Sequence, residues 1–254
     1  MNKVFLIAIT FVLFISNVHA SCYDKKLEDS ANFTSCQEGG EKGLMSDQYN
    51  LARMYQFGVG VAPDSKQAVY WYEKAAKQGH VKAQFNLGLM YNKEQNDVQA
   101  VEWYRKAAEQ GHLNAQFSLG LMYGSGQGVA QDHKQAVEWY RKAAEQGLDR
   151  AQYTLGNMYD QGLGVVQDNQ QSLEWYNKAA EQGHAKAQYN LGVVYTNGKG
   201  VTQDNVIAYM WLVIASSYGD KIALSGKESV ATEMTAEQIS EAEKLAKEWM
   251  AKHQ

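Results

Sequence analysis

One short sequence pattern recurs along the chain at nearly constant spacing. The pattern Ala-Gln-Phe/Tyr-x-Leu-Gly-x-x-Tyr occurs in four full copies and one looser copy. The full copies begin at Ala83, Ala115, Ala151 and Ala187, and the looser copy begins at Asp47. Successive copies start 36, 32, 36 and 36 residues apart. Because a period of this size is typical of stacked supersecondary units that contact only their neighbours, the chain is predicted to form an elongated array rather than a single globular core.

The repeated pattern reads as the first helix of each unit. In the third copy, Ala115, Leu119 and Met122 recur at the spacing of one helical face. Gly120 lies inside this helix, where glycine costs about 1 kcal/mol relative to alanine. The glycine recurs at the same place in every full copy, at Gly88, Gly156 and Gly192. We therefore expect a close approach between two helices at this position, which a side chain would block.

A glycine loop, residues 124–129 in the third copy, leads to a second helix. Asp132 and Gln135 have the spacing of a capping box at its start, as do Asp64 with Gln67 and Asp168 with Gln171. The apolar residues of this helix then follow the stripe of an amphipathic helix, and a glycine ends it. They are Ala136, Trp139, Tyr140, Ala143 and Ala144, followed by Gly147. The second copy lacks four residues, and we place this deletion in its loop, 92–95, with Asn96 as the cap of the next helix.

These features resemble the Sel1-like repeat family, a relative of the tetratricopeptide repeat. The resemblance rests on the A-Q-x-x-L-G-x-M-Y run, the G-x-G-V loop, the D-x-x-x-A-x-x-W-Y-x-K-A-A helix and the terminal glycine. It implies an all-α fold, a right-handed α/α superhelical solenoid of about five helix-turn-helix repeats with capping helices at both ends. We place the repeats at 47–82, 83–114, 115–150, 151–186 and 187–220, which together span 47–220.

The two ends of the chain differ from the repeats. Residues 1–20 have the form of a signal peptide, with Lys3 before an apolar run and small residues before Ser21. The run is too short for an integral membrane span, which needs about 20 apolar residues. We therefore expect export to the periplasm or beyond, and we favour a soluble protein over a lipoprotein anchored at Cys22, because His19 fits badly at the −3 position.

Capping segments are predicted at 21–46 and 221–254. Cys22 and Cys36 are the only cysteines, and two cysteines in an oxidising compartment most simply pair. A disulfide between them would close a short loop and tie down the first segment. At the other end, a helix that begins after Thr235 would cover the apolar second helix of the fifth repeat, since solenoids need terminal caps.

Several residue sets resemble functional sites but have structural explanations. The tryptophans of the second helices lie on the face that packs between helices, so we assign them to the core. They are Trp71, Trp103, Trp139, Trp175 and Trp211. His80, His112 and His184 each follow a terminal glycine, and we interpret them as exposed turn residues rather than metal ligands, since equivalent positions lie too far apart to share one ion. The glycine loops do not continue into a phosphate-binding motif. We predict no cofactor and no metal.

The net charge and the absence of known catalytic motifs argue against two classes of function. The net charge of −4, with no basic block, argues against nucleic acid as a partner. The chain has no H-E-x-x-H, G-x-S-x-G or S-x-x-K motif, so no enzyme is predicted. The alternative is a β-lactamase-like or cell-wall-directed hydrolase, because some cysteine-rich Sel1-like proteins are described as β-lactamases. Those proteins have a cysteine pair in each repeat, and the repeats of this chain have no cysteine.

The resemblance implies a scaffold that binds a protein or peptide partner, in an envelope-associated or host-interaction role. We expect a monomer whose partner lies against the inner, concave wall formed by the first helices. In each first helix, three variable positions with spacing i, i+3, i+7 share one face. This first-helix face comprises Asn50, Arg53, Phe57, Asn86, Leu89, Lys93, Ser118, Leu121, Ser125, Thr154, Asn157, Gln161, Asn190, Val193 and Asn197. The alternative, which we weigh nearly equally, is that these positions are merely solvated.

Overall fold

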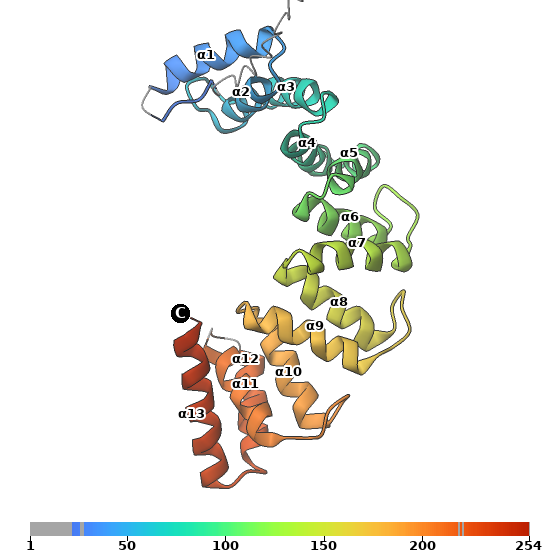
Figure 1. Cartoon of the computed structure of the whole chain (residues 1–254), viewed down its shortest axis with the longest axis vertical. Coiled ribbons are helices and arrows are strands. Elements are labelled where there is room, and N and C mark those ends of the chain that lie inside the picture. The colour runs from blue at the N-terminus through green and yellow to red at the C-terminus, as the bar shows by residue number, and fades with distance from the viewer. Residues whose placement is uncertain (1–21, 26–27, 218, 220, 254) are drawn as a thin grey trace, which may run out of the picture. The chain divides into compact units, whose positions relative to one another are not determined.

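Helices are the only regular elements of the residues that the structure describes. The computed structural model describes residues 22–25, 28–217, 219 and 221–253, so the signal peptide predicted at 1–20 lies outside it. The all-α prediction is confirmed for this part of the chain (Figure 1). Its helices are α1 (Asp29–Glu41), α2 (Met45–Phe57), α3 (Ser65–Lys77), α4 (Val81–Lys93), α5 (Asp97–Glu109), α6 (Leu113–Ser125), α7 (His133–Glu145), α8 (Asp149–Gln161), α9 (Asn169–Glu181), α10 (Ala185–Asn197), α11 (Asn205–Ser217), α12 (Lys221–Ala231) and α13 (Ala236–Lys252).

The chain divides into two compact units after Trp71, within α3. In the first unit, α1 packs against α2, and Gly40 lies close enough to Leu51 and Trp71 that a Cβ would sit 3.3–3.4 Å from their side chains. In the second unit, each first helix packs on the second helix of its own repeat: α4 on α5, α6 on α7, α8 on α9 and α10 on α11. Each second helix also packs on the next first helix, so the repeats stack through α5 and α6, α7 and α8, and α9 and α10.

Two helices extend into segments that were predicted to be loops. Helix α6 includes Gly124 and Ser125, because it ends only where Gly126 takes a left-handed φ of 74° and donates its N–H to the carbonyl of Met122. In the shortened repeat, α4 likewise continues to Lys93, so the first two residues of the loop predicted at 92–95 are helical. The last residue of each predicted i, i+3, i+7 set is therefore helical, and the three positions do share one helical face.

The glycine inside the first helix of each full copy allows a close approach to the second helix, as predicted. A Cβ built on Gly120 would lie 2.6 Å from the ring of Tyr140, and one on Gly88 would lie 2.6 Å from the ring of Tyr104. Gly192 meets Leu212 in the same way. Atoms this close cannot coexist without movement of the partner, and these partners are buried. The recurring glycine therefore sets the distance between the two helices of a repeat.

Exchange of Gly120 for alanine is expected to destabilise the protein, whereas the same exchange at Gly124 is not. Both glycines lie in α6, but a Cβ on Gly124 would meet its nearest neighbours at an ordinary 3.7 Å. We expect Gly120→Ala to lower the free energy of unfolding by about 1–3 kcal/mol through overpacking against Tyr140. Gly124→Ala should raise it by up to about 1 kcal/mol. Urea unfolding followed by circular dichroism would compare the two variants, and equal midpoints would contradict the close-approach explanation.

The tryptophans of the second helices are core residues, as predicted. All five are 9% exposed or less. Ala136, Tyr140, Ala143 and Ala144 are also buried, as the stripe indicated, but so is Val137, which lies outside the stripe. The reason is that α7 packs on both α6 and α8, so it buries more than one face.

The glutamine of each repeated pattern is buried and links consecutive helices, a role that the sequence reading did not assign. Gln116 donates its Nε2–H to the carbonyl of Ala108 at 3.2 Å and accepts at Oε1 from Gln146 at 2.7 Å. Gln84 and Gln152 make the same pair of bonds. A buried amide requires such partners, since an unpaired polar group inside a protein costs about 1–3 kcal/mol. The bond to Ala108 holds α6 against the end of the preceding second helix, α5, and the bond from Gln146 joins it to the end of α7.

The predicted capping boxes at Asp64, Asp132 and Asp168 form only in part. The carboxylate of Asp132 accepts from the backbone N–H groups of Lys134 and Gln135 at 2.9 and 3.0 Å. The reciprocal bond, in which the side-chain oxygen of Gln135 would accept from the N–H of Asp132, does not form, because that N–H donates instead to the carbonyl of Tyr123 at 2.9 Å. Asn96 occupies the cap position of α5, but its side chain makes no capping bond. The described residues contain a complete capping box at Thr235 and Gln238.

The three repeat histidines are half-buried helix caps, so the prediction of exposed turn residues is wrong. Nδ1 of His112 accepts from the N–H of Ala115 at 3.2 Å, and its ring stacks on Phe85 at 4.5 Å. His80 caps α4 and His184 caps α10 in the same way. Burial is the largest cause that lowers the pKa of all three imidazoles. Neutral imidazole is the form that can accept the capping bond.

These three histidines should make the protein less stable in mild acid. Because their folded-state pKa lies below the ordinary value of 6.5, the unfolded chain binds protons at higher pH than the folded chain. The stabilisation is therefore complete above pH 6.5 and is lost as the pH falls through the lowered folded pKa. Urea midpoints should drop between pH 7.5 and pH 5. Replacing all three histidines with asparagine, which caps helices without titrating, should flatten this dependence, and an unchanged slope would contradict it.

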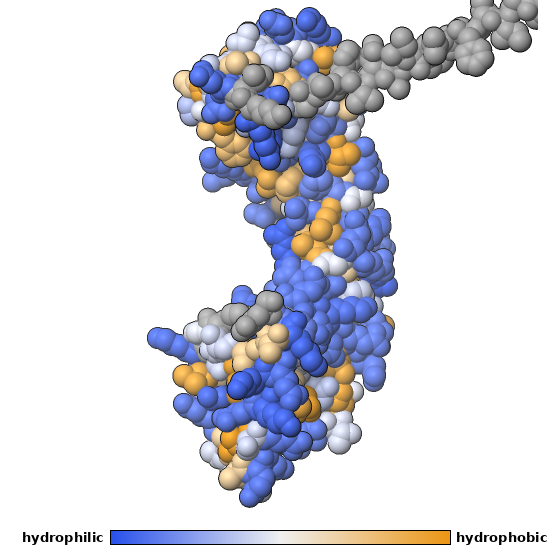
Figure 2. Space-filling model, turned by 60° about the vertical axis from the view of Figure 1, so that its left-hand side comes forward, coloured by the Kyte–Doolittle hydropathy of each residue, from blue (hydrophilic) through white to orange (hydrophobic). Residues whose placement is uncertain are grey.

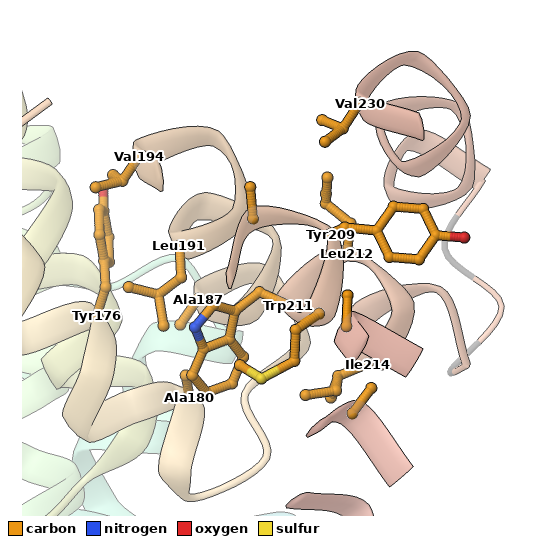
Figure 3. Packing of buried hydrophobic residues seen from close by; sticks show 14 of the residues in the cluster. Tyr176, Ala180, Ala187, Leu191, Val194, Tyr209, Trp211, Leu212, Ile214 and Val230 are labelled. Atoms are coloured by element: carbon orange, nitrogen blue, oxygen red, sulfur yellow. The ribbon is translucent and has the colours of Figure 1, made fainter. Parts of the chain in front are cut away.

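Helices α12 and α13 cover the apolar surface of α11, the last second helix. Tyr209, Trp211, Leu212 and Ile214 of α11 are buried together with Val230 of α12 (Figure 3). From α13, Ala242 and Ala246 are fully buried in the same cluster, with Ile239 and Trp249 partly buried beside them. This is the packing expected of a terminal cap.

Candidate functional site

The fifteen residues of the first-helix face all lie on first helices, and none of them is buried. The first position of each set is half-buried, and the last is exposed. The middle position carries an exposed apolar side chain in three of the five helices, at Leu89 (43% exposed), Leu121 (47%) and Val193 (37%). Figure 2 shows a largely hydrophilic surface with separate hydrophobic patches. The face is therefore accessible and mixed in character.

In the second unit, residues of α8 and α10 line one hollow of about 430 Å³. From the predicted set it contains Asn157 and Gln161 of α8 with Asn190, Val193 and Asn197 of α10. Asn157 Oδ1 accepts from the hydroxyl of Tyr176 at 2.6 Å and from Nδ2 of Asn190 at 3.2 Å. Burial, above all, raises the pKa of Tyr176 to about 12, so its hydroxyl keeps its proton and donates at neutral pH. The two asparagines are thus oriented by a fixed hydrogen-bond network.

A neighbouring hollow of about 390 Å³ lies between α6 and α8. It brings together Leu121 and Ser125 of α6 with Thr154, Asn157 and Gln161 of α8. Asn157 and Gln161 line both hollows, so the two are adjacent. The structure thus joins predicted residues of three successive first helices. Asn86, Leu89, Lys93 and Ser118 line neither hollow.

In the first unit, Asn50, Arg53 and Phe57 of α2 line a separate hollow of about 380 Å³. Its other wall includes Tyr23 and Lys25, which the sequence reading did not single out. These two residues precede the first repeat, so the repeat pattern carries no signal for them. The Cys22–Cys36 disulfide does form, and with the bond from the N–H of Cys22 to Asp47 it holds this segment against α1 and α2.

Potential metal ligands are not clustered in the part of the chain that the structure describes. No group of three or more potential ligands among His, Cys, Asp and Glu is present in this part of the chain. The three repeat histidines use Nδ1 for helix capping. None of the helices between residues 22 and 253, so far as the structure describes them, has the length and hydrophobicity to cross a membrane.

Comparison with protein families identifies the repeats. The model of the Sel1 repeat matches residues 46–80, 81–112, 113–148, 149–184 and 185–220. These five matches cover more than half of the chain, and each begins within two residues of a predicted repeat boundary.

Solved structures and one curated protein are similar to this chain. A Sel1 repeat protein from Oxalobacter formigenes is 35% identical, with a TM-score of 0.75 over 86% of this chain and 93% of its own. A protective antigen present in uropathogenic Escherichia coli strains, which displays an SLR fold, is 33% identical, with a TM-score of 0.57 over 89% of this chain. An uncharacterized protein of Neisseria meningitidis serogroup B is 39% identical over 77 residues, 28% of this chain. The chain spans 57% of the antigen and 16% of the Neisseria protein.

Proposed function

Because the chain belongs to the Sel1 repeat family, we propose that it is a non-enzymatic scaffold that binds a protein or peptide partner on the first-helix face. The observation that carries the proposal is that two adjacent hollows bring together variable residues of α6, α8 and α10, the first helices of three consecutive repeats. Structural residues of a solenoid are expected to repeat, whereas a residue that recognises one partner need not. Eleven of the fifteen variable positions line one of the three hollows, whereas the repeated tryptophans and alanines are buried in the core.

The chemistry of these hollows favours a peptide over a polyanion. Asparagine and glutamine side chains carry both donors and acceptors, as peptide groups do. Asn157 and Asn190 are held in place by the hydroxyl of Tyr176 and by each other, so little side-chain entropy would be lost on binding. Exposed Leu121 and Val193 beside them would contact apolar side chains of the partner.

We also propose that the protein acts outside the cytoplasm, in an envelope-associated or host-interaction role. The Cys22–Cys36 disulfide supports an oxidising compartment. The same bond speaks against a lipoprotein, because lipid attachment at Cys22 would use the sulfur that the disulfide occupies. The monomeric state stays a prediction.

Affinity capture would test the scaffold proposal. The wild-type chain should retain a specific protein from an envelope extract or host serum, read by mass spectrometry. Alanine at Arg53, Asn157 and Asn190 together should abolish this capture. A matched control with alanine at Gln170 and Asn177 of α9, outside the first-helix face, should leave it unchanged. Retention by the triple variant would contradict the site assignment, and nitrocefin hydrolysis by the purified chain would favour a hydrolase instead.

A further inference from the structure

The hollow of the first unit is lined by two cationic side chains, an amide and aromatic rings. We propose that it binds a carboxylate joined to a hydrophobic group, such as the carboxyl-terminal end of a peptide whose last residue is hydrophobic. This inference rests on the proposed scaffold function and names a ligand class for one part of the same face. Lys25 and Arg53 line the hollow together with the amide of Asn50 and the ring of Tyr23.

The positive charge of this hollow stands out against the chain as a whole. The protein carries a net charge of −4, yet the charged groups that line the hollow, Lys25 and Arg53, are both cationic. Among the described residues, neither cation takes part in a salt bridge. The position of Arg53 holds an apolar or amide residue in the other four first helices. A carboxylate is the complementary ligand, because it accepts charge-assisted hydrogen bonds from both cations.

Aromatic rings position the arginine of this hollow. The guanidinium carbon of Arg53 lies 5.9 Å from the ring centroid of Tyr49 and 6.0 Å from that of Phe57. Contacts of this kind favour a cation at that place. Phe57 is itself 63% exposed, and Met54 and Val59 complete an apolar wall. The hollow therefore presents a cationic end and an apolar end, which matches a carboxylate beside a hydrophobic side chain.

The wall that carries Lys25 is anchored by contacts found only at this end of the chain. The N–H of Cys22 donates to Oδ1 of buried Asp47 at 3.1 Å, and Asp47 stands where the four full repeats have alanine. Fully buried Asn32 accepts from the N–H of Asp24 and donates to its carbonyl, both at 2.9 Å. With the disulfide, these bonds fix residues 22–24 against α1 and α2, so Tyr23 and Lys25 are held at the hollow.

Peptide binding to the full mature chain would test the proposal. The probe is a fluorescein-labelled hexapeptide, Gly-Ser-Gly-Ser-Gly-Phe, with a free carboxyl terminus, measured by fluorescence anisotropy. Its amidated form should bind about tenfold or more weakly, because hydrogen bonds to the charged group are lost. Arg53-dependent binding of an amidated peptide that contains an internal Glu-Phe would assign the carboxylate to a side chain instead. Equal binding of the free acid and the amide would overturn the proposal.

Single substitutions identify the site. Arg53→Gln and Lys25→Gln should each weaken binding of the free-acid peptide about tenfold. Lys42→Gln removes a charge from the same unit at an exposed position outside the hollow and should have no effect. Unchanged affinity of Arg53→Gln would overturn the assignment, and circular dichroism would verify that each variant is folded.

The outcomes separate this inference from the scaffold proposal. Loss of partner capture on exchange of Asn157 and Asn190, with no peptide binding in the first unit, would support the scaffold and reject the carboxylate pocket. Peptide binding that depends on Arg53, without any captured protein, would support the pocket and reject the wider face.

Discussion

Exchange of Gly128 for alanine is expected to destabilise the protein by roughly 2–4 kcal/mol. Gly128 is the second glycine of the loop between α6 and α7, and its φ of 66° lies in the left-handed region that costs other residues about 1–2 kcal/mol. A Cβ at this position would also run directly into the backbone of Asp97, the first residue of α5. Because backbone cannot turn aside as a flexible side chain can, the loop would have to leave its site on the preceding repeat.

Gly147 provides the matched control for this exchange. Its φ of 93° is also left-handed, but a Cβ there would have no neighbour within 4 Å. Gly147→Ala should therefore cost only the backbone strain of about 1–2 kcal/mol. Urea unfolding would compare the midpoints, and hydrogen exchange should show faster exchange at the start of α5 in Gly128→Ala alone. Equal losses in the two variants would show that the loop does not hold the repeats together.

The positions that could be predicted from the sequence are those whose role follows from a single helix or a single turn. The burial of Trp139 follows from helical periodicity, because its neighbours at i+1, i+4 and i+5 are also small or apolar. The close approach at Gly120 follows from a residue that is costly in a helix and yet recurs. In both cases the spacing of the residues in the sequence matches the spacing of the contacts in the structure, so the sequence pattern predicts the packing.

Roles that depend on contacts with another helix were missed or misread. Gln116 looks like a surface residue within its own helix, and it is buried only because Ala108 and Gln146 of the adjacent second helices bond to it. His112 has no local feature that predicts burial, since the ring that stacks on it belongs to Phe85 of α4, two helices before the helix that His112 caps. The periodicity of apolar residues within one helix does not show which residues of other helices will contact it.

The candidate site likewise has one part that helical spacing predicts and another part that depends on contacts between helices. Helical spacing predicted that Asn157 and Asn190 share the first-helix face, and both are half-buried there. The hollow that they share and the contribution of Tyr176 depend on how repeats stack. Lys25 lies outside every repeat, and only the fold of the disulfide-bonded segment brings it to Arg53.

Removal of the disulfide by the double exchange Cys22→Ala and Cys36→Ala is expected to lower the stability of the first unit by about 3 kcal/mol. The bond joins residues 14 apart, and closing a loop of that size restricts the unfolded chain by about this amount. Both cysteines are also buried, Cys36 completely, so the exchange leaves a small cavity beside α1. Thermal unfolding of the oxidised wild-type chain, the reduced wild-type chain and the variant would measure the loss.

The hydrogen bonds around the disulfide determine which part of the first unit should be destabilised when the disulfide is removed. Asp47 and Asn32 still bind the backbone of residues 22 and 24 after the bond is removed, so the segment should loosen rather than unfold α1 and α2. Adding Asp47→Ala to the variant should then release the segment and expose the amides of α1 to rapid hydrogen exchange. A reductant should shift the melting temperature of the wild-type chain and leave that of the cysteine variant unchanged. If the reductant shifted both equally, the stabilisation would not arise from this bond, and the anchored wall that carries Lys25 would lose its main support.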